Sequence, residues 1–374
     1  MKHTAKLGAL VLGAMALVLG AIMVFGFASC NFSTDEQTET VTYTVTFNTI
    51  GGTEVAGQTI IQGNKATKPV NPTKTATATE TFTFTDWYTS TDGGATLSEN
   101  AFDFDTEITS NITLYAKWCI FVKVTGATVQ SSDFWDLSGA FDLHNLPITI
   151  GNLWVCDHEV TQKEYTTYCK YGSDNPSSDI GLGDNYPAYY VSWYDAVVYC
   201  NLRSMAEGLT PVYKIGTETN PANWPDIVSD NGKYCGPSVD NSTWNEITFD
   251  QTADGYRLPT EAEWEYTARG GNGGIPAAQT TYSGSDDIDA VAWYEGNSGN
   301  KVHEVKGKNP NGLNIYDMSG NVREWCCDRM WGNNGAARGG DITEVAWCSV
   351  KAQMHCDLYS RSSVSGFRVV RNAQ

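Results

Sequence analysis

Four short motifs, in a fixed order near the end of the chain, restrict its fold more than any other feature of the sequence. They are Gly-Tyr-Arg-Leu-Pro-Thr-Glu-Ala-Glu-Trp-Glu-Tyr at residues 255–266, Asp-Met-Ser-Gly-Asn-Val-Arg-Glu-Trp at residues 317–325, Arg-Gly-Gly at residues 338–340 and Gly-Phe-Arg at residues 366–368. Four ordered motifs are far more specific than any one of them. We expect their arginines, Arg257, Arg338 and Arg368, to anchor loops as buried charges.

The composition agrees with a loop-rich fold. Hydrophobic residues at 41% and aromatic residues at 12% are enough for a core, while only 18% of residues are charged. Together with 36 glycines and 12 tryptophans, this favours an irregular fold stabilised by aromatic packing over a helical bundle. The length of 374 residues leaves room for two folded units after a leader segment.

Together the motifs resemble the formylglycine-generating enzyme family, also called the sulfatase-modifying-factor domain. Residues 156–162 (Cys-Asp-His-Glu-Val-Thr-Gln) and 187–193 (Pro-Ala-Tyr-Tyr-Val-Ser-Trp) extend the resemblance over about residues 119–374. It implies an irregular α+β fold related to C-type lectins. The family contains copper-dependent oxidases and also members that have lost this chemistry, so function must be argued from the site itself.

Capping patterns predict three helix starts in this domain. Residues 161–164, 192–195 and 260–263 each place a hydroxyl three positions before an acid. The hydroxyl and the carboxylate can then satisfy the free amide groups of a first helical turn. We expect the second helix to run to about Gly208.

The third helix is expected to end at Gly270, a suitable left-handed cap. Within it, Trp264 and Ala268 are one turn apart and should face inward. Glu265 and Arg269 are also four residues apart, and we expect them to form an ion pair on the surface.

Residues 41–118 have a different pattern and predict a small β module. Strands are expected over residues 42–47, 81–87 and 111–118, because these runs are rich in Thr, Val, Phe and Tyr and alternate in polarity. The segment resembles the Listeria–Bacteroides repeat, a β-grasp-like module of bacterial surface proteins. This resemblance implies a spacer or adhesion role and no catalysis.

The first 29 residues read as an export signal. A basic start is followed by an uncharged apolar run from Leu7 to Phe27, which is also long enough for a membrane anchor. Phe27-Ala28-Ser29-Cys30 resembles a bacterial lipobox, which implies lipidation at Cys30. The polar residues 30–40 would then tether the protein to the inner or outer membrane, outside the cytoplasm.

The net charge of −19 excludes nucleic acid as a partner, because a phosphate backbone requires a basic surface. Nine cysteines follow Cys30, an odd number, so at least one stays unpaired even if disulfides form, and the sequence alone does not assign the pairing. The adjacent Cys326 and Cys327 should point to opposite faces of a strand.

The family's copper chemistry depends on two cysteines separated by four residues after the Arg-Gly-Gly motif, because Cu(I) prefers sulfur ligands. Cys348 falls close to the second position, whereas Thr343 and Glu344 occupy the region of the first. The partner cysteine of the oxidases is therefore missing. Cys348 is the single candidate catalytic residue, but a structural role as a small buried side chain is favoured, and copper is not expected as a cofactor.

Calcium is the metal that the resemblance favours. In related domains a loop binds Ca²⁺ through a side-chain oxygen, two backbone carbonyls and a glutamate. The corresponding residues are Asp317, Gly320, Val322 and Glu324. The alternative is that Asp317 caps a turn and Glu324 pairs with Arg323 or Arg338.

Histidines give no further metal site. His144, His158, His303 and His355 are scattered without metal-ligand spacing. We therefore expect a surface-anchored lipoprotein whose formylglycine-generating-enzyme-like domain is a non-catalytic binding or structural module for an extracytoplasmic protein or glycan. The alternative is an extracytoplasmic, metal-dependent oxidoreductase of the same family that acts on a protein substrate.

Overall fold

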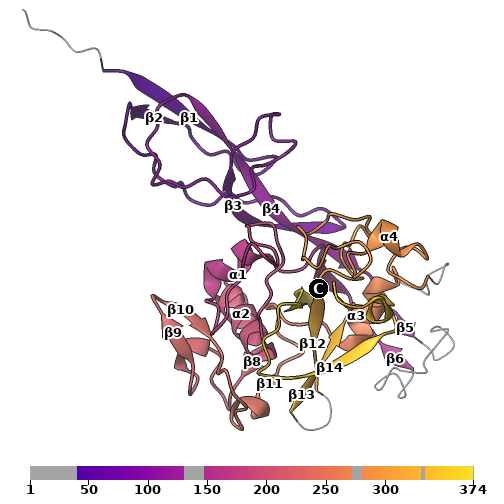
Figure 1. Cartoon of the computed structure of the whole chain (residues 1–374). Helices are drawn as coiled ribbons and strands as arrows, with labels where there is room; N and C mark the ends of the chain where they lie inside the picture. The colour runs from indigo at the N-terminus through magenta and orange to yellow at the C-terminus, as the bar shows by residue number, and fades with distance from the viewer. Residues whose placement is uncertain (1–39, 130–146, 272–279, 330–332, 374) are drawn as a thin grey trace, which may run out of the picture. The chain divides into compact units, whose positions relative to one another are not determined.

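A computed structural model describes residues 40–129, 147–271, 280–329 and 333–373 (Figure 1). The expected export signal, Cys30, His144 and nearly all of the tether lie outside the described residues. Within the described ranges, no helix combines the length and apolar character needed to cross a bilayer.

A mixed sheet of six strands contains the first strand of the described chain and also the last. Five strands follow the order β16-β7-β4-β1-β2, and β3 also pairs with β4. The pairing of β1 with β4 is parallel, and the other pairings are antiparallel. The strands are β1 (Thr42–Asn48), β2 (Gln58–Ile61), β3 (Glu80–Tyr88), β4 (Ile112–Val124), β7 (Leu153–Cys156) and β16 (Val370–Asn372).

Strand β4 is longer than the sequence predicted. The expected strand ended at Trp118, at the boundary of the small module, but β4 continues to Val124. Its first residues pair with β1, with Ile112 opposite Val45, and its last residues pair with β7, with Val122 opposite Val155. The extension forms because β7 and β3 together provide hydrogen-bond partners for the backbone of residues 119–124. A prediction from local sequence patterns could not include these partners.

A second sheet brings three of the four motifs side by side. Its order is β14-β13-β12-β15. Glu324 on β12 lies opposite Arg338 on β13 and opposite Gly366 on β15. Cys326 and Cys327 pack into two different hydrophobic clusters, which confirms that they face opposite sides of the strand. The strands are β12 (Arg323–Arg329), β13 (Asn334–Arg338), β14 (Gln353–Asp357) and β15 (Ser365–Gly366).

The three expected helix starts are confirmed. Thr161, Ser192 and Thr260 each cap a helix through a reciprocal capping box with the acid three residues later. The second helix ends at Ala206, close to the expected Gly208, and Gly270 adopts the expected left-handed backbone with a φ of +74°. The helices are α1 (Gln162–Tyr168), α2 (Trp193–Ala206), α3 (Glu261–Ala268) and the short α4 (Ile288–Val291).

The remaining elements are short and occur within long loops. They are β5 (Thr128–Val129), β6 (Ile148–Thr149), β8 (Tyr213–Lys214), β9 (Val228–Asp230), β10 (Lys233–Cys235), β11 (Thr248–Phe249), and the 3₁₀ helices η3 (Pro221–Asn223), η4 (Trp244–Glu246) and η5 (Val345–Cys348).

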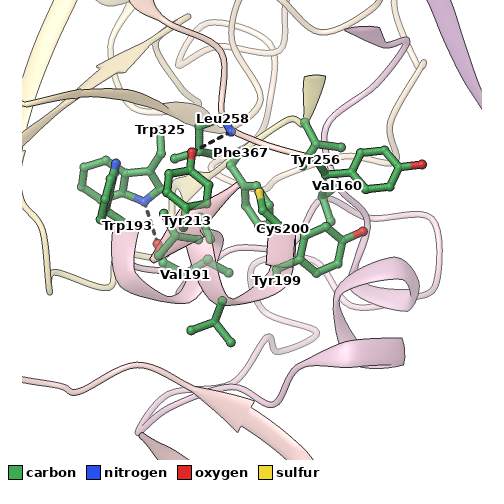
Figure 2. Close-up of a cluster of buried hydrophobic side chains, with 14 of the residues drawn as sticks. Val160, Val191, Trp193, Tyr199, Cys200, Tyr213, Tyr256, Leu258, Trp325 and Phe367 are labelled. Carbon is green, nitrogen blue, oxygen red and sulfur yellow. Dashed lines mark hydrogen bonds between the residues drawn. The ribbon is translucent and has the colours of Figure 1, made fainter. Parts of the chain in front are cut away.

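Aromatic side chains build the main core around α2 (Figure 2). Trp325 donates its ring N–H to the carbonyl of Val191 at 2.8 Å, and the Tyr213 hydroxyl accepts from the Leu258 amide at 3.0 Å. These bonds satisfy the polar atoms of buried aromatic residues. The core therefore connects the motif residues directly to α2 and to the loop that follows it.

Helix α3 corrects one expectation. Glu265 and Arg269 do pair, at 2.7 Å, but both side chains are only 1% exposed, so the pair lies inside the protein and not on its surface. Every residue of α3 is buried, because the helix packs against both β12 and β13. Trp264 and Ala268 face inward, as expected.

Candidate functional site

A buried ion pair joins three motifs at the centre of the domain. The guanidinium of Arg368 donates to both carboxylate oxygens of Glu324, each at 2.6 Å. The Trp264 ring N–H donates to the same carboxylate at 2.7 Å. The ion-pair partner of Glu324 is thus Arg368, and neither of the partners considered from the sequence, Arg323 or Arg338.

The loop before β12 carries the predicted calcium ligands. Asp317 is buried and accepts a hydrogen bond from the Lys306 amide at 2.6 Å. Gly320 has a φ of +77°, and a Cβ at this position would lie 2.2 Å from the Trp293 carbonyl oxygen. Only glycine permits this approach. Val322 follows with its amide hydrogen-bonded to Glu159 at 3.1 Å.

Glu159 is a part of this site that sequence reasoning missed. Its carboxylate is fully buried and also accepts from the Asn321 side chain at 2.8 Å. Burial raises its pKa well above the usual value, and the nearby charges of Asp317 and Glu324 raise it further. A signal did exist, because Glu159 belongs to the motif at residues 156–162, but nothing in the sequence placed it beside residue 321.

Three buried carboxylates therefore gather around the guanidinium of Arg368. Burial raises the pKa of Asp317 to about 6. An excess of negative charge is a fitting environment for a cation. Glu324 fits less well, because three hydrogen bonds use most of the roughly four lone-pair directions of its carboxylate. Calcium binding stays a prediction.

Cys348 is a buried thiol at the end of η5. Its sulfur lies 3.7 Å from the Asp341 carbonyl oxygen and 3.6 Å from that of Glu344, so the S–H group has acceptors from the backbone. Burial raises its pKa to about 12, which keeps it protonated near neutral pH. This is the opposite of what a reactive or metal-binding cysteine requires.

The region where the family resemblance places the first copper-ligating cysteine contains exposed polar residues. The Thr343 hydroxyl donates to Asp341 at 2.5 Å, and the Glu344 carboxylate accepts from the Trp347 ring at 2.9 Å. In the part of the chain that the structure describes, one cluster of three His, Cys, Asp or Glu side chains has metal-ligand spacing, and it does not include Cys348.

That cluster consists of Cys119, Cys156 and His158, all buried. The two sulfur atoms lie 3.4 Å apart, and His158 Nδ1 lies 3.8 Å from Cys156 Sγ. Nδ1 is also 2.5 Å from a carboxylate oxygen of Asp157, and Nε2 is 3.4 Å from Glu164. The sequence could not reveal this cluster, because it depends on the pairing register of two strands.

Two family profiles match the chain. The "Sulfatase-modifying factor enzyme 1-like domain" matches residues 122–373, and the "Listeria-Bacteroides repeat domain" matches residues 43–117. The chain belongs to the sulfatase-modifying factor enzyme 1-like family. The irregular α+β fold that the motifs implied is thereby confirmed.

Relatives in this family have different names. Chaperone protein LppX of Paenibacillus barcinonensis is 36% identical over 251 residues, which cover 60% of this chain and 82% of LppX. The formylglycine-generating enzyme of Streptomyces coelicolor is 36% identical over 100 residues, covering 23% of this chain and 30% of the enzyme. The similarity to LppX thus extends over 251 residues, whereas the similarity to the formylglycine-generating enzyme extends over only 100 residues.

Solved structures agree with the assignment to the sulfatase-modifying factor fold. Treponema denticola variable protein 1 superposes with a TM-score of 0.51 and 26% identity, covering 69% of this chain and 96% of that protein. CarF superposes with the same TM-score and identity, covering 68% of this chain and 98% of its own.

The charged state of His158 gives a pH-dependent prediction. Burial opposes its charged form, but the carboxylates of Glu164 and Asp157 outweigh this and raise its pKa to about 10, above the ordinary 6.5. The folded state thus binds this proton more tightly than the unfolded state does. The resulting stabilisation, on the order of a few kcal/mol, is complete below pH 6.5 and is lost as the pH rises toward 10.

We expect the melting temperature to fall between pH 7 and pH 10, and the fall to be smaller in His158→Gln. The control is His355→Gln, because His355 is exposed and should leave the profile unchanged. Thermal melts by circular dichroism over this range measure the effect. Parallel profiles for the wild type and His158→Gln would contradict a charged, buried His158.

Proposed function

We propose that this protein is an envelope lipoprotein whose sulfatase-modifying-factor domain binds an extracytoplasmic partner and does not catalyse copper-dependent oxidation. One observation carries the proposal. The sulfur of Cys348 is buried between two backbone carbonyls, and the exposed residues Thr343 and Glu344 occupy the region where the family resemblance places the first copper-ligating cysteine. A lone, protonated thiol does not provide the two soft ligands that hold Cu(I).

The buried motif residues around this site also support a binding or structural role. Arg368, Glu324 and Trp264 hold the motifs together through contacts that leave no charged end of the pair exposed to a substrate. Arg338 is equally buried, between Glu265 and the carbonyl of Val350. Such residues fix loops in place, and the loops can then bind a partner without any reaction.

A copper assay tests the proposal. The wild type and Cys348→Ala should bind Cu(I) with the same affinity, and neither should convert a sulfatase-type cysteine peptide to an aldehyde. The formylglycine-generating enzyme of Streptomyces coelicolor serves as the positive control. Stoichiometric Cu(I) binding that Cys348→Ala removes, together with aldehyde formation, would instead establish the alternative function, a metal-dependent oxidoreductase.

A protein is the favoured class of partner. Support comes from LppX, a relative named as a chaperone and similar to this chain over 82% of its own length. The net charge of −19 supports a partner other than nucleic acid. A glycan ligand is the alternative, and covalent cross-linking in the native host followed by identification of the linked molecule distinguishes the two.

Lipidation at Cys30 predicts the location of the protein. Acylation would attach the mature chain to a membrane outside the cytoplasm through the polar tether. In the native host we expect the wild type in the membrane fraction and Cys30→Ser outside it, with loss of palmitate labelling. Cys235→Ser is the matched control and should stay in the membrane fraction. Unlabelled wild-type protein would contradict the proposal.

We also propose a calcium ion in the loop that contains Asp317, Gly320 and Val322, with Glu324 sharing its carboxylate with Arg368. The support is the gathering of three buried carboxylates around one arginine. A divalent cation would compensate the excess charge and join the loop to β12.

The calcium proposal predicts a shift in stability. Millimolar calcium should raise the melting temperature relative to EDTA, and Asp317→Asn should remove most of this rise because one charged ligand is lost. Asp286→Asn is the control, since Asp286 also bonds a backbone amide but lies outside this loop. A rise that persists in Asp317→Asn, or the absence of any rise in the wild type, excludes the site.

A further inference from the structure

Two thiols, those of Cys119 and Cys156, face each other inside the protein. Their sulfur atoms lie 3.4 Å apart, and both side chains are almost fully buried. Neither residue belongs to the family motifs near the end of the chain. Among the described cysteines, no other sulfur-to-sulfur contact of this kind is present.

The strands β4 and β7 hold this pair in place. In their antiparallel register Phe121 lies opposite Cys156, and the Asp157 amide donates to the Ile120 carbonyl at 3.0 Å. Cys119 is two residues from Phe121, so it lies on the same face of the sheet and diagonal to Cys156. The backbone pairing thus keeps both sulfur atoms close, whatever their oxidation state.

We propose that Cys119 and Cys156 form a disulfide bond when the chain folds in an oxidising solution. The oxidant is a second disulfide, of a small thiol or of an oxidoreductase. One thiolate attacks it and releases a first thiol, and the other cysteine then attacks the mixed disulfide and releases a second. Both cysteines lose a proton, the two sulfur atoms share a new bond, and the oxidant takes up the two electrons.

Metal binding by the same pair is the competing explanation. Zinc takes at least three protein ligands and would therefore require His158 beside the two sulfur atoms, with a free lone pair on Nδ1. That nitrogen lies 2.5 Å from a carboxylate oxygen of Asp157, to which it donates, and Nε2 lies beside Glu164. The geometry therefore assigns the imidazole to the two acids and leaves the sulfur atoms to each other.

The bond would join β4 to β7. Cys119 lies between the two family matches, which end at residue 117 and begin at residue 122. A cross-link at this point would fasten the strand that continues from the small module into the larger fold. Because both sulfur atoms are buried, the bond would form during folding and then resist reduction in the native state.

Refolding tests the proposal directly. The full mature chain is unfolded with reductant and refolded with either oxidised or reduced glutathione. Free thiols are then alkylated in denaturant, and the chain is mapped by mass spectrometry. In the oxidised sample we expect a peptide that links Cys119 to Cys156, lighter than its two parts by two hydrogen atoms, and alkylation of the other mature cysteines.

Stability gives a second measurement. Reductant added during unfolding should lower the melting temperature of the oxidised wild type by about 5–10 °C. It should leave the double variant Cys119→Ala/Cys156→Ala unchanged. Cys200→Ala is the matched control, because Cys200 is equally buried but has no sulfur neighbour among the described residues, and it should keep the dependence on reductant.

Three results would overturn the proposal. Alkylation of both Cys119 and Cys156 after oxidative refolding would show that the pair stays reduced. Linkage of either residue to another cysteine would show a different pairing. Zinc or Cu(I) retained by the wild type in native mass spectrometry, and lost in the double variant, would show a metal site. The peptide map of the wild type shows whether Cys119 and Cys156 are linked even if the variants fail to fold.

Discussion

The fold depends on one buried ion pair, between Arg368 and Glu324. These residues are 1% and 0% exposed, and the side chain of Trp264 shares the same carboxylate. The three residues come from segments more than forty positions apart, so the pair holds α3, β12 and the last motif in one arrangement. Removing one partner of such a pair would leave a buried charge uncompensated and typically costs about 3–5 kcal/mol.

The buried motif residues do not themselves decide whether the domain catalyses copper-dependent oxidation. Gly340 has a φ of +68°, and a Cβ at this position would lie only 2.4 Å from the carbonyl carbon of Trp347, next to Cys348, so glycine permits this close approach. The motif therefore positions this thiol whether or not a second cysteine is present. Because Thr343 and Glu344 provide no sulfur, the chain retains the architecture of the sulfatase-modifying factor family without the oxidase ligand pair. A strong family assignment therefore does not by itself assign an activity.

Local interactions were the part of the fold that the sequence predicted well. Each capping box involves residues three positions apart, so Thr260 and Glu263 could be assigned from spacing alone. The ion pair of Glu265 and Arg269 was likewise found, but its burial was not, because burial depends on β12 and β13 packing over the helix. The end of β4 was misplaced for a similar reason, since residues beyond Trp118 continue the strand by pairing with β3 and β7.

The sequence by itself determined the family and the helix starts, since each rests on short motifs whose residues are close together in the chain. The tertiary structure decided which distant charges and thiols meet. It paired Glu324 with Arg368 and not with an arginine nearer in the sequence, placed Glu159 beside the loop before β12, and brought Cys119 to Cys156. These contacts depend on strand register and on packing between segments far apart in the sequence. Short sequence patterns predict neither of these.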